Sequence, residues 1–312
     1  MVSAMVLNQQ LRFQGSAAIA LVGMMSGAIL NIFLDPIFIF ALRLGVKGAA
    51  IATMISQLLS FFLLFFYGCT RKGNIPIKFS HFSPSGKRYL EMMRGGIPAL
   101  FRQGLSSLAI IFINNFARPY GDAAIAAIAI VDRLCFFAYS LILGFGQGFQ
   151  PVCGFNYGAK LYERLKKAFW FSTRICFIGL LLISLALAVF APHIIALFRK
   201  DDLEVIAIGT LRLRLHCMGL PLMAIVIMYN MMTQTMGKTL EASITAFTRQ
   251  GFFLVPALII LSSRLGLSGI HLATPIADIA TFFVVIPLII RVLRQLSFPE
   301  TKQTRGEAVE KI

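Results

Sequence analysis

The feature that most constrains this chain is a succession of apolar blocks, each long enough to cross a lipid bilayer as a helix. A crossing takes about 20 apolar residues, and we count eight such blocks, at roughly 17–42, 46–69, 95–118, 123–152, 168–198, 203–236, 242–262 and 267–290. Hydrophobic residues make up 58% of the chain, and only 13% of its residues are charged. The sequence therefore predicts an all-α polytopic membrane protein with eight transmembrane helices.

The formal net charge of +16 would suit nucleic acid, but the placement of the charges indicates a membrane instead. Basic residues gather in alternate loops: in 71–94, in 160–174, at Lys238 and Arg249, and in the tail from Arg291 onward. The positive-inside rule places such loops in the cytoplasm, against anionic lipid headgroups. We therefore expect a multi-pass protein of the plasma (inner) membrane with a cytoplasmic C-terminus. Its partner is the lipid bilayer, and we expect no nucleic acid.

A near-duplication of fifteen residues indicates how the helices are organised. "RLGVKGAAIATMISQ" begins at Arg43, and "RLGLSGIHLATPIAD" begins at Arg264, 221 positions later. The glycines alone could simply permit tight turns, but the likeness continues upstream, in equal steps from Asn8 to Gly15 and from Asn230 to Gly237. Since an even number of predicted spans separates the two LGxxG turns, the copies are parallel. Duplicated helix sets of this kind are typical of secondary transporters.

The duplication also predicts additional chain ahead of Met1. The second copy has four further spans before Asn230, whereas the first copy starts almost at the N-terminus. The symmetry therefore requires about 129 more residues, enough for three helices and most of a fourth. We expect the chain to be an N-terminally truncated product or fragment.

Four motifs carry a resemblance to a known family. "LNQQLRFQG", "LNIFLDPIFIF", "LGVKGAAIAT" and "GFGQGFQPVCGFNYGAK" occur in this order along the chain. They resemble the multidrug and toxic compound extrusion (MATE) family over about residues 7–295. The resemblance implies a bundle of twelve helices in two six-helix lobes around a central cleft, of which eight helices are present here. It divides the chain into a remnant of the N-terminal lobe (1–92), a six-helix C-terminal lobe (93–295) and a cytoplasmic tail (296–312).

The same resemblance implies a function. It indicates a secondary active antiporter that exports organic cations or drugs in exchange for H⁺ or Na⁺, by alternating access between the lobes. The expected partners are small organic cations, the expected state is a monomer, and no cofactor other than the coupling ion is expected.

An acidic residue in an otherwise uncharged span is the strongest candidate for chemistry. Asp35 lies in the predicted span 17–42, where a carboxylate is costly and therefore a functional candidate. Asn31 is four residues earlier on the same helical face, and Pro36 interrupts the helix and frees a carbonyl nearby. The alternative is a residue at the outer helix end that faces water. The family resemblance places a cation site here, with Asn31, Asp35 and Thr53 as the matching positions.

The predicted second lobe carries its own polar candidates for a substrate cleft or polar network: Arg102, Gln103, Asp132, Arg133, Gln147, Gln150 and Asp278. Because an unpaired charge at this depth is expensive, we expect Asp132 to pair with Arg102, or Asp278 with Arg102 or Arg133. A structural ion pair and a substrate or proton role are both open. Arg212 and His216 are four residues apart on one helix face, and for His216 polar filling beside the arginine is the favoured interpretation over proton sensing.

No enzyme motif is present. The sequence lacks GxSxG, a Walker GxxxxGK[ST] loop and HExxH, and its cysteines and histidines show no metal-ligand spacing. The chain is therefore predicted not to be an enzyme, and transport must use an ion gradient. Two alternatives remain: a flippase for lipid-linked precursors from the same superfamily, which requires a strongly cationic cleft, or an inactive truncated chain.

Overall fold

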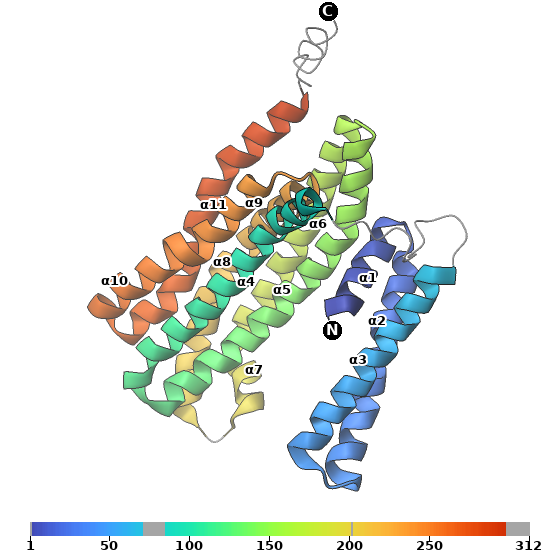
Figure 1. The fold of residues 1–312 in the computed structure, drawn as a ribbon. Helices are drawn as coiled ribbons and strands as arrows, with labels where there is room; N and C mark the ends of the chain where they lie inside the picture. Colours follow the sequence, from blue (N-terminus) through green and yellow to red (C-terminus); the bar gives the residue numbers. More distant parts are fainter. Residues whose placement is uncertain (1, 71–84, 201, 298–312) are drawn as a thin grey trace, which may run out of the picture. The chain divides into compact units, whose positions relative to one another are not determined.

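The computed structural model describes residues 2–70, 85–200 and 202–297, and these residues form helices and short turns without a strand (Figure 1). The chain divides into two compact units, Met1–Gly86 and Lys87–Ile312. The first contains α1 (Val2–Phe13), α2 (Ala17–Pro36), the π-helix η1 (Ile37–Ala41) and α3 (Gly45–Thr70). The second contains α4 (Gly86–Ala117), the 3₁₀ turn η3 (Arg118–Tyr120), α5 (Gly121–Gly158), α6 (Tyr162–Val189), α7 (Ala191–Phe198), α8 (Leu203–Thr235), α9 (Thr239–Phe247), the π-helix η4 (Thr248–Leu254), α10 (Val255–Leu265) and α11 (Leu267–Ser297).

The helices confirm a polytopic membrane protein. Among the described residues, seven helical segments are long and apolar enough to cross a membrane: Ala17–Ala41, Gly45–Cys69, Gln103–Gly158, Tyr162–Val189, Leu203–Thr235, Thr239–Leu265 and Leu267–Leu296. The longest one joins most of α4 to α5 through η3. It therefore accounts for two of the eight predicted spans.

One predicted span is divided differently in the structure. The block expected at 168–198 is two helices, because α6 ends at Val189 and the short helix α7 begins at Ala191. Pro192 lies at the start of α7, where the missing N–H of proline costs nothing. Apolar composition alone could not reveal this break, since both helices are hydrophobic. The expected tail 296–312 lies mostly outside the described residues.

In the first unit, α1 packs against α2 and α3. A small apolar cluster holds them together: Ala4, Leu7, Leu11, Ala20 and Leu64. Gly15 turns the chain between α1 and α2 with φ +77°, a conformation that favours glycine. Asn8 Nδ2 donates to the carbonyl oxygen of Ala20 at 2.8 Å, which links the two helices across this turn.

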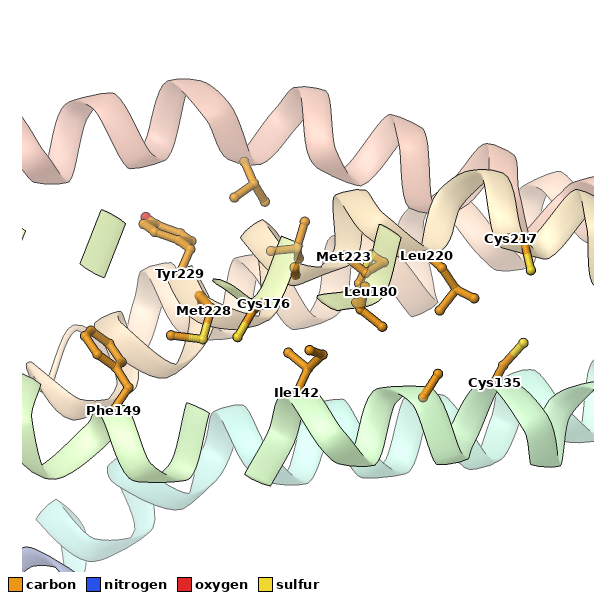
Figure 2. Close-up of a cluster of buried hydrophobic side chains, with 14 of the residues drawn as sticks. Cys135, Ile142, Phe149, Cys176, Leu180, Cys217, Leu220, Met223, Met228 and Tyr229 are labelled. Carbon is orange, nitrogen blue, oxygen red and sulfur yellow. The ribbon is translucent and has the colours of Figure 1, made fainter. Parts of the chain in front are cut away.

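In the second unit, α8 is the central helix. It packs against α5, α6, α7, α9 and α11, and 72% of its most apolar window is buried, against a third or less for the other candidate spans. Figure 2 shows Cys135, Ile142 and Phe149 of α5 facing the side of α8 that carries Met223 and Met228. A second cluster joins α4 to α10 and α11. Because α8 is buried among other helices, its polar side chains are kept away from lipid.

The structure bears out the internal repeat at the level of single contacts. Asn230 Nδ2 donates to the carbonyl oxygen of Ala242 at 2.8 Å, and Gly237 has φ +74°, as at Asn8 and Gly15. The two LGxxG turns also agree, with φ +53° at Gly45 and +58° at Gly266. The duplicated sequence therefore folds into two copies of one helix-turn arrangement.

Candidate functional site

The three residues expected to take up a cation come together within the first unit. Asp35 lies in the last turn of α2, one residue before Pro36 and the π-helix η1. Asn31 Nδ2 donates to Asp35 Oδ1 at 3.1 Å and to Thr53 Oγ1 of α3 at 3.5 Å. Asn31 and Asp35 are half-buried, whereas Thr53 is exposed. Asp35 therefore has polar neighbours, and it is not an isolated carboxylate in water.

This arrangement suits a small cation for a simple chemical reason. The side-chain oxygens of Asn31, Asp35 and Thr53 are hard ligands, and a carboxylate supplies the compensating charge. After Pro36 the chain continues as a π-helix, whose wider turn closes with Leu42 N–H on the carbonyl of Ile37 at 2.9 Å. The trio can thus accept a proton on Asp35 or hold a cation between two helices.

The second unit contains a partly open cavity of about 340 Å³. Its wall is largely apolar, with Ile110, Phe136 and Met223 among the lining residues. The polar or charged side chains that line it are Gln103, Ser106, Asp132, Tyr139, His216, Asn230, Thr245, Arg249, Gln250 and Thr274. An apolar pocket of this size with a few converging polar groups is the usual form of a small-molecule site.

One ion pair at this cavity joins η4 to α11. Arg249 Nε donates to Asp278 Oδ1 at 2.8 Å, and Arg249 Nη2 donates to the Tyr139 hydroxyl at 3.0 Å. The Tyr139 hydroxyl donates in turn to Asp278 Oδ2 at 3.3 Å. The guanidinium carbon of Arg249 also lies 5.3 Å from the centre of the Tyr139 ring, a cation–π contact. Asp278 is thus fully buried and fully partnered.

A second ion pair joins α8 to α5. Arg212 Nη2 donates to Asp132 Oδ1 at 3.0 Å, and Arg212 Nη1 reaches the carbonyl oxygen of Ile270 at 3.5 Å. The Arg212 side chain is 2% exposed, whereas that of Asp132 is 37% exposed. Arg212 is thus the buried half of an ion pair whose other half, Asp132, is partly exposed at the cavity. His216, for which polar filling was the favoured interpretation, is buried and also lines the cavity.

The expected pairings of the second-unit candidates need correction. We expected Asp278 to pair with Arg102 or Arg133, but the structure gives Arg249 as its partner, and Arg133 is exposed. Asp132 pairs with Arg212, whereas the side chain of Arg102, its expected partner, lies outside the described residues. Gln103 lines the cavity.

The two glutamines near the end of α5 do not join this site. Gln147 and Gln150 are half-buried and lie outside the set of residues that line the cavity.

Sequence reasoning missed Arg249 by assigning it to a cytoplasmic loop. Arg249 lies inside η4, within the segment Thr239–Leu265 that is long and apolar enough to cross a membrane. A signal was available, because Arg249 falls within the block predicted at 242–262, where an unpaired arginine is costly. Tyr139 gave no comparable signal, since a tyrosine in an apolar helix requires no partner of opposite charge.

These features define an all-α, multi-pass membrane protein built from a duplicated helix set, an arrangement that is common among secondary transporters. The chain belongs to the MATE family of multidrug efflux transporters, because the family model MatE matches residues 98–259. The resemblance inferred from the four motifs is thereby confirmed.

Similar proteins agree with this assignment. The multidrug export protein MepA of Staphylococcus aureus (strain MSSA476) is 31% identical over 277 residues, 88% of this chain and 60% of that protein. MepA of Staphylococcus haemolyticus is 29% identical over 89% of this chain and 61% of its own length. A crystal structure of MATE in complex with MaL6 aligns with a TM-score of 0.87 at 27% identity, and it covers 94% of this chain and 68% of that structure. The chain thus spans about three fifths of the curated relatives it matches.

Proposed function

We propose that this chain acts in secondary active export of organic cations, with Asn31, Asp35 and Thr53 taking up the coupling ion, H⁺ or Na⁺. The observation that carries the proposal is the contact of Asn31 with both Asp35 and Thr53, which gathers three oxygen-bearing side chains from two helices. A carboxylate within a candidate membrane span is costly unless it binds something. Ion binding or protonation removes that cost and alters the packing of α2 against α3.

The wider expectations of the family complete the proposal. The chain works in the plasma membrane as a monomer with a cytoplasmic C-terminus, and two helical lobes give alternating access. The proteins described as MepA are multidrug exporters by name, which supports small-molecule cargo for this chain as well. Export without a nucleotide-binding motif requires an ion gradient, and the proposed ion site supplies the coupling.

The flippase alternative receives less support from the cavity in the second unit. A pyrophosphate-linked lipid needs a strongly cationic wall, yet the charged side chains described on this wall are one carboxylate, Asp132, and one guanidinium, Arg249. Each is already paired with an opposite charge. The net charge of the four groups is zero, which is unsuited to a multiply charged anion.

The proposal is tested by transport in proteoliposomes. Ethidium efflux is measured under an imposed pH or Na⁺ gradient for the 312-residue chain, and for the chain joined to the part of the S. aureus relative that it does not cover. We expect gradient-driven efflux that Asp35→Asn abolishes at equal expression. The matched control Asp122→Asn removes an exposed carboxylate at the start of α5 and keeps efflux.

Two outcomes would overturn the proposal. Full efflux by Asp35→Asn would remove the coupling role of this carboxylate. Failure of both proteins to transport under either gradient would reject export and leave the chain inactive.

A further inference from the structure

The helix α6 has one packed face and one open face along its length. The packed face lies against α5 and α8, and its buried residues recur every third or fourth position: Leu165, Phe169, Thr173, Cys176 and Leu180. The exposed residues on the other face are spaced in the same way: Lys167, Phe171, Arg174, Ile178, Leu181 and Leu185. Since α6 is a candidate membrane span, this second face is open to lipid within the described part of its unit.

The charges of α6 are confined to its first half. Its charged residues are Glu163, Arg164, Lys166, Lys167 and Arg174, and the stretch 175–189 that completes the helix carries no charge. The 28 residues of α6 rise about 42 Å, which exceeds the roughly 30 Å of a hydrocarbon core. The charged first turns therefore lie at the level of the lipid headgroups, and the uncharged remainder crosses the core.

An open groove lies on α6 where the charged part meets the apolar part. It has a volume of about 480 Å³ and is lined by Lys166, Lys167, Trp170, Phe171 and Arg174. Trp170 is 44% exposed and Phe171 is 65% exposed, so two aromatic rings are accessible between the basic residues. Tryptophan is enriched where headgroups meet the hydrocarbon core, which agrees with the level assigned to the groove.

Two of the three basic residues in the groove are free to bind an anion. Lys166 Nζ lies 2.9 Å from Glu163 Oε1, so its charge is already balanced. Neither Lys167 nor Arg174 makes a salt bridge or a hydrogen bond with another described residue. Because helical side chains lean toward the N-terminus of their helix, the long side chain of Arg174 can extend back to headgroup level. The two free cations can then converge on one anion.

We propose that this groove holds one anionic phospholipid, with its phosphate between Lys167 and Arg174. Its acyl chains follow the apolar continuation of the same face, over Phe171 and Ile178. A zwitterionic lipid fits less well, because its ammonium group brings a further positive charge to the two basic residues. A basic protein surface attracts anionic lipid in general, whereas the inference concerns one lipid bound at one place. It goes beyond the proposed export function and does not depend on it.

The groove contains its own probe, because Trp170 is the only tryptophan of the chain. The 312-residue chain is reconstituted in mixtures of phosphatidylglycerol and phosphatidylcholine, and one of the two lipids carries bromine on the upper part of its acyl chains. Bromine quenches tryptophan fluorescence on contact, so the quenching reports which lipid lies beside Trp170. We expect phosphatidylglycerol to be preferred about fivefold or more, since each basic residue near an anionic lipid contributes about this much.

Two double variants separate a bound lipid from general attraction by charge. Lys167→Gln/Arg174→Gln removes both free cations of the groove, and it should reduce the preference to about twofold or less. Lys160→Gln/Arg164→Gln is the matched control, because it removes two exposed basic residues at the same end of α6 but outside the groove. It lowers the net charge equally and should keep the preference. A thermal unfolding curve in phosphatidylcholine shows that each protein is folded.

Three results would overturn the lipid site. The first is equal quenching by the two brominated lipids in the unchanged chain, and the second is a preference that survives in Lys167→Gln/Arg174→Gln. The third is an equal loss in both double variants, which would indicate attraction by the basic surface as a whole. Each of these results leaves the Asp35-dependent efflux assay untouched, and a failure of that assay leaves the lipid preference untouched.

Discussion

The two copies of the internal repeat share an asparagine hydrogen bond that links two helices, but they do not share their charged residues. In both copies an asparagine donates to a helix carbonyl twelve residues further along at 2.8 Å, through Asn8 to Ala20 and through Asn230 to Ala242. Both turns that follow have glycine at φ near +75°, at Gly15 and Gly237. The asparagine hydrogen bond and the positive-φ glycine both fix the turn between two adjacent helices. Any helix pair of this kind needs such a turn, so both copies keep these residues.

The charged residues occupy different places in the two copies. At the offset of 221, Asp35 and Asn31 of the first copy align with Pro256 and Phe252, while Asp278 of the second aligns with Gln57. The first copy thus holds a half-buried carboxylate near an amide and a hydroxyl, and the second holds a buried carboxylate locked to Arg249. The helix scaffold requires neither arrangement, and each can therefore serve a separate chemical role.

This contrast predicts that losing a charge lowers stability strongly in the second copy and hardly at all in the first. The largest effect is expected at Arg249. Arg249→Leu leaves Asp278 buried and unpaired, and we expect it to lower the free energy of unfolding by about 3–5 kcal/mol. Asp35→Asn leaves no charge stranded, so its effect is expected to stay within about 0.5 kcal/mol. The measurement is reversible unfolding of the purified chain in mixed micelles.

The double variant Arg249→Leu/Asp278→Leu sharpens the comparison. It removes the whole pair, and we expect it to recover most of the lost stability, because apolar replacements of buried pairs are often neutral. If Asp35→Asn destabilised the chain as strongly as Arg249→Leu, the proposed distinction would be wrong: Asp35 would be a structural carboxylate like the ion-paired Asp278, and not one that is free to bind an ion.

A smaller effect is expected at the second glycine of each LGxxG turn. A Cβ added to Gly48 would lie 2.5 Å from the carbonyl oxygen of Phe38, and one added to Gly269 would clash with the carbonyl of Leu261. Since backbone must move in both cases, Gly48→Ala and Gly269→Ala should each lower stability by about 1–3 kcal/mol.

The control for the turn glycines is Gly144→Ala on α5. An added Cβ there meets no atom within 4 Å, so Gly144→Ala should leave stability unchanged or raise it by up to about 1 kcal/mol. The transition midpoint in the same micelles measures all three variants. A tolerated alanine in one turn only would show that the two copies close differently.

Much of the fold could be predicted because membrane helices leave strong signals. Long apolar blocks located the spans, and repeated turn residues such as Gly45 and Gly266 located the duplication. The break between α6 and α7 could not be predicted, because Phe190 and Pro192 lie within a continuous apolar run and proline is also tolerated inside membrane helices. The apolar block at 168–198 therefore looked like one span although it contains two helices.

From residue patterns alone, the candidate site could be predicted only where its residues are local in sequence, and Thr53, 22 positions from Asn31, was placed there by the family resemblance. Asn31 and Asp35 are four positions apart, so helix periodicity brings them together. Asp278 and Arg249 are 29 residues apart, and Asp132 and Arg212 are 80 apart, so their pairing depends on tertiary packing around α8. Sequence could state that each charge needs a partner, but choosing among several arginines required the structure.

A loss smaller than that at the turn glycines is predicted for Asn8 and Asn230, the two asparagines that link neighbouring helices. Asn8→Ala and Asn230→Ala each remove one buried side-chain hydrogen bond, while the carbonyls of Ala20 and Ala242 keep their positions within helices. We expect each to cost about 1 kcal/mol, with the two values equal within about 0.5 kcal/mol. Asn156→Ala is the control, because among the described residues its half-buried amide donates only to the carbonyl of Val152, within its own helix. Unequal losses of unfolding free energy at Asn8 and Asn230 would mean that the same hydrogen bond stabilises the two copies to different extents. One copy would then keep the geometry without depending on it for stability.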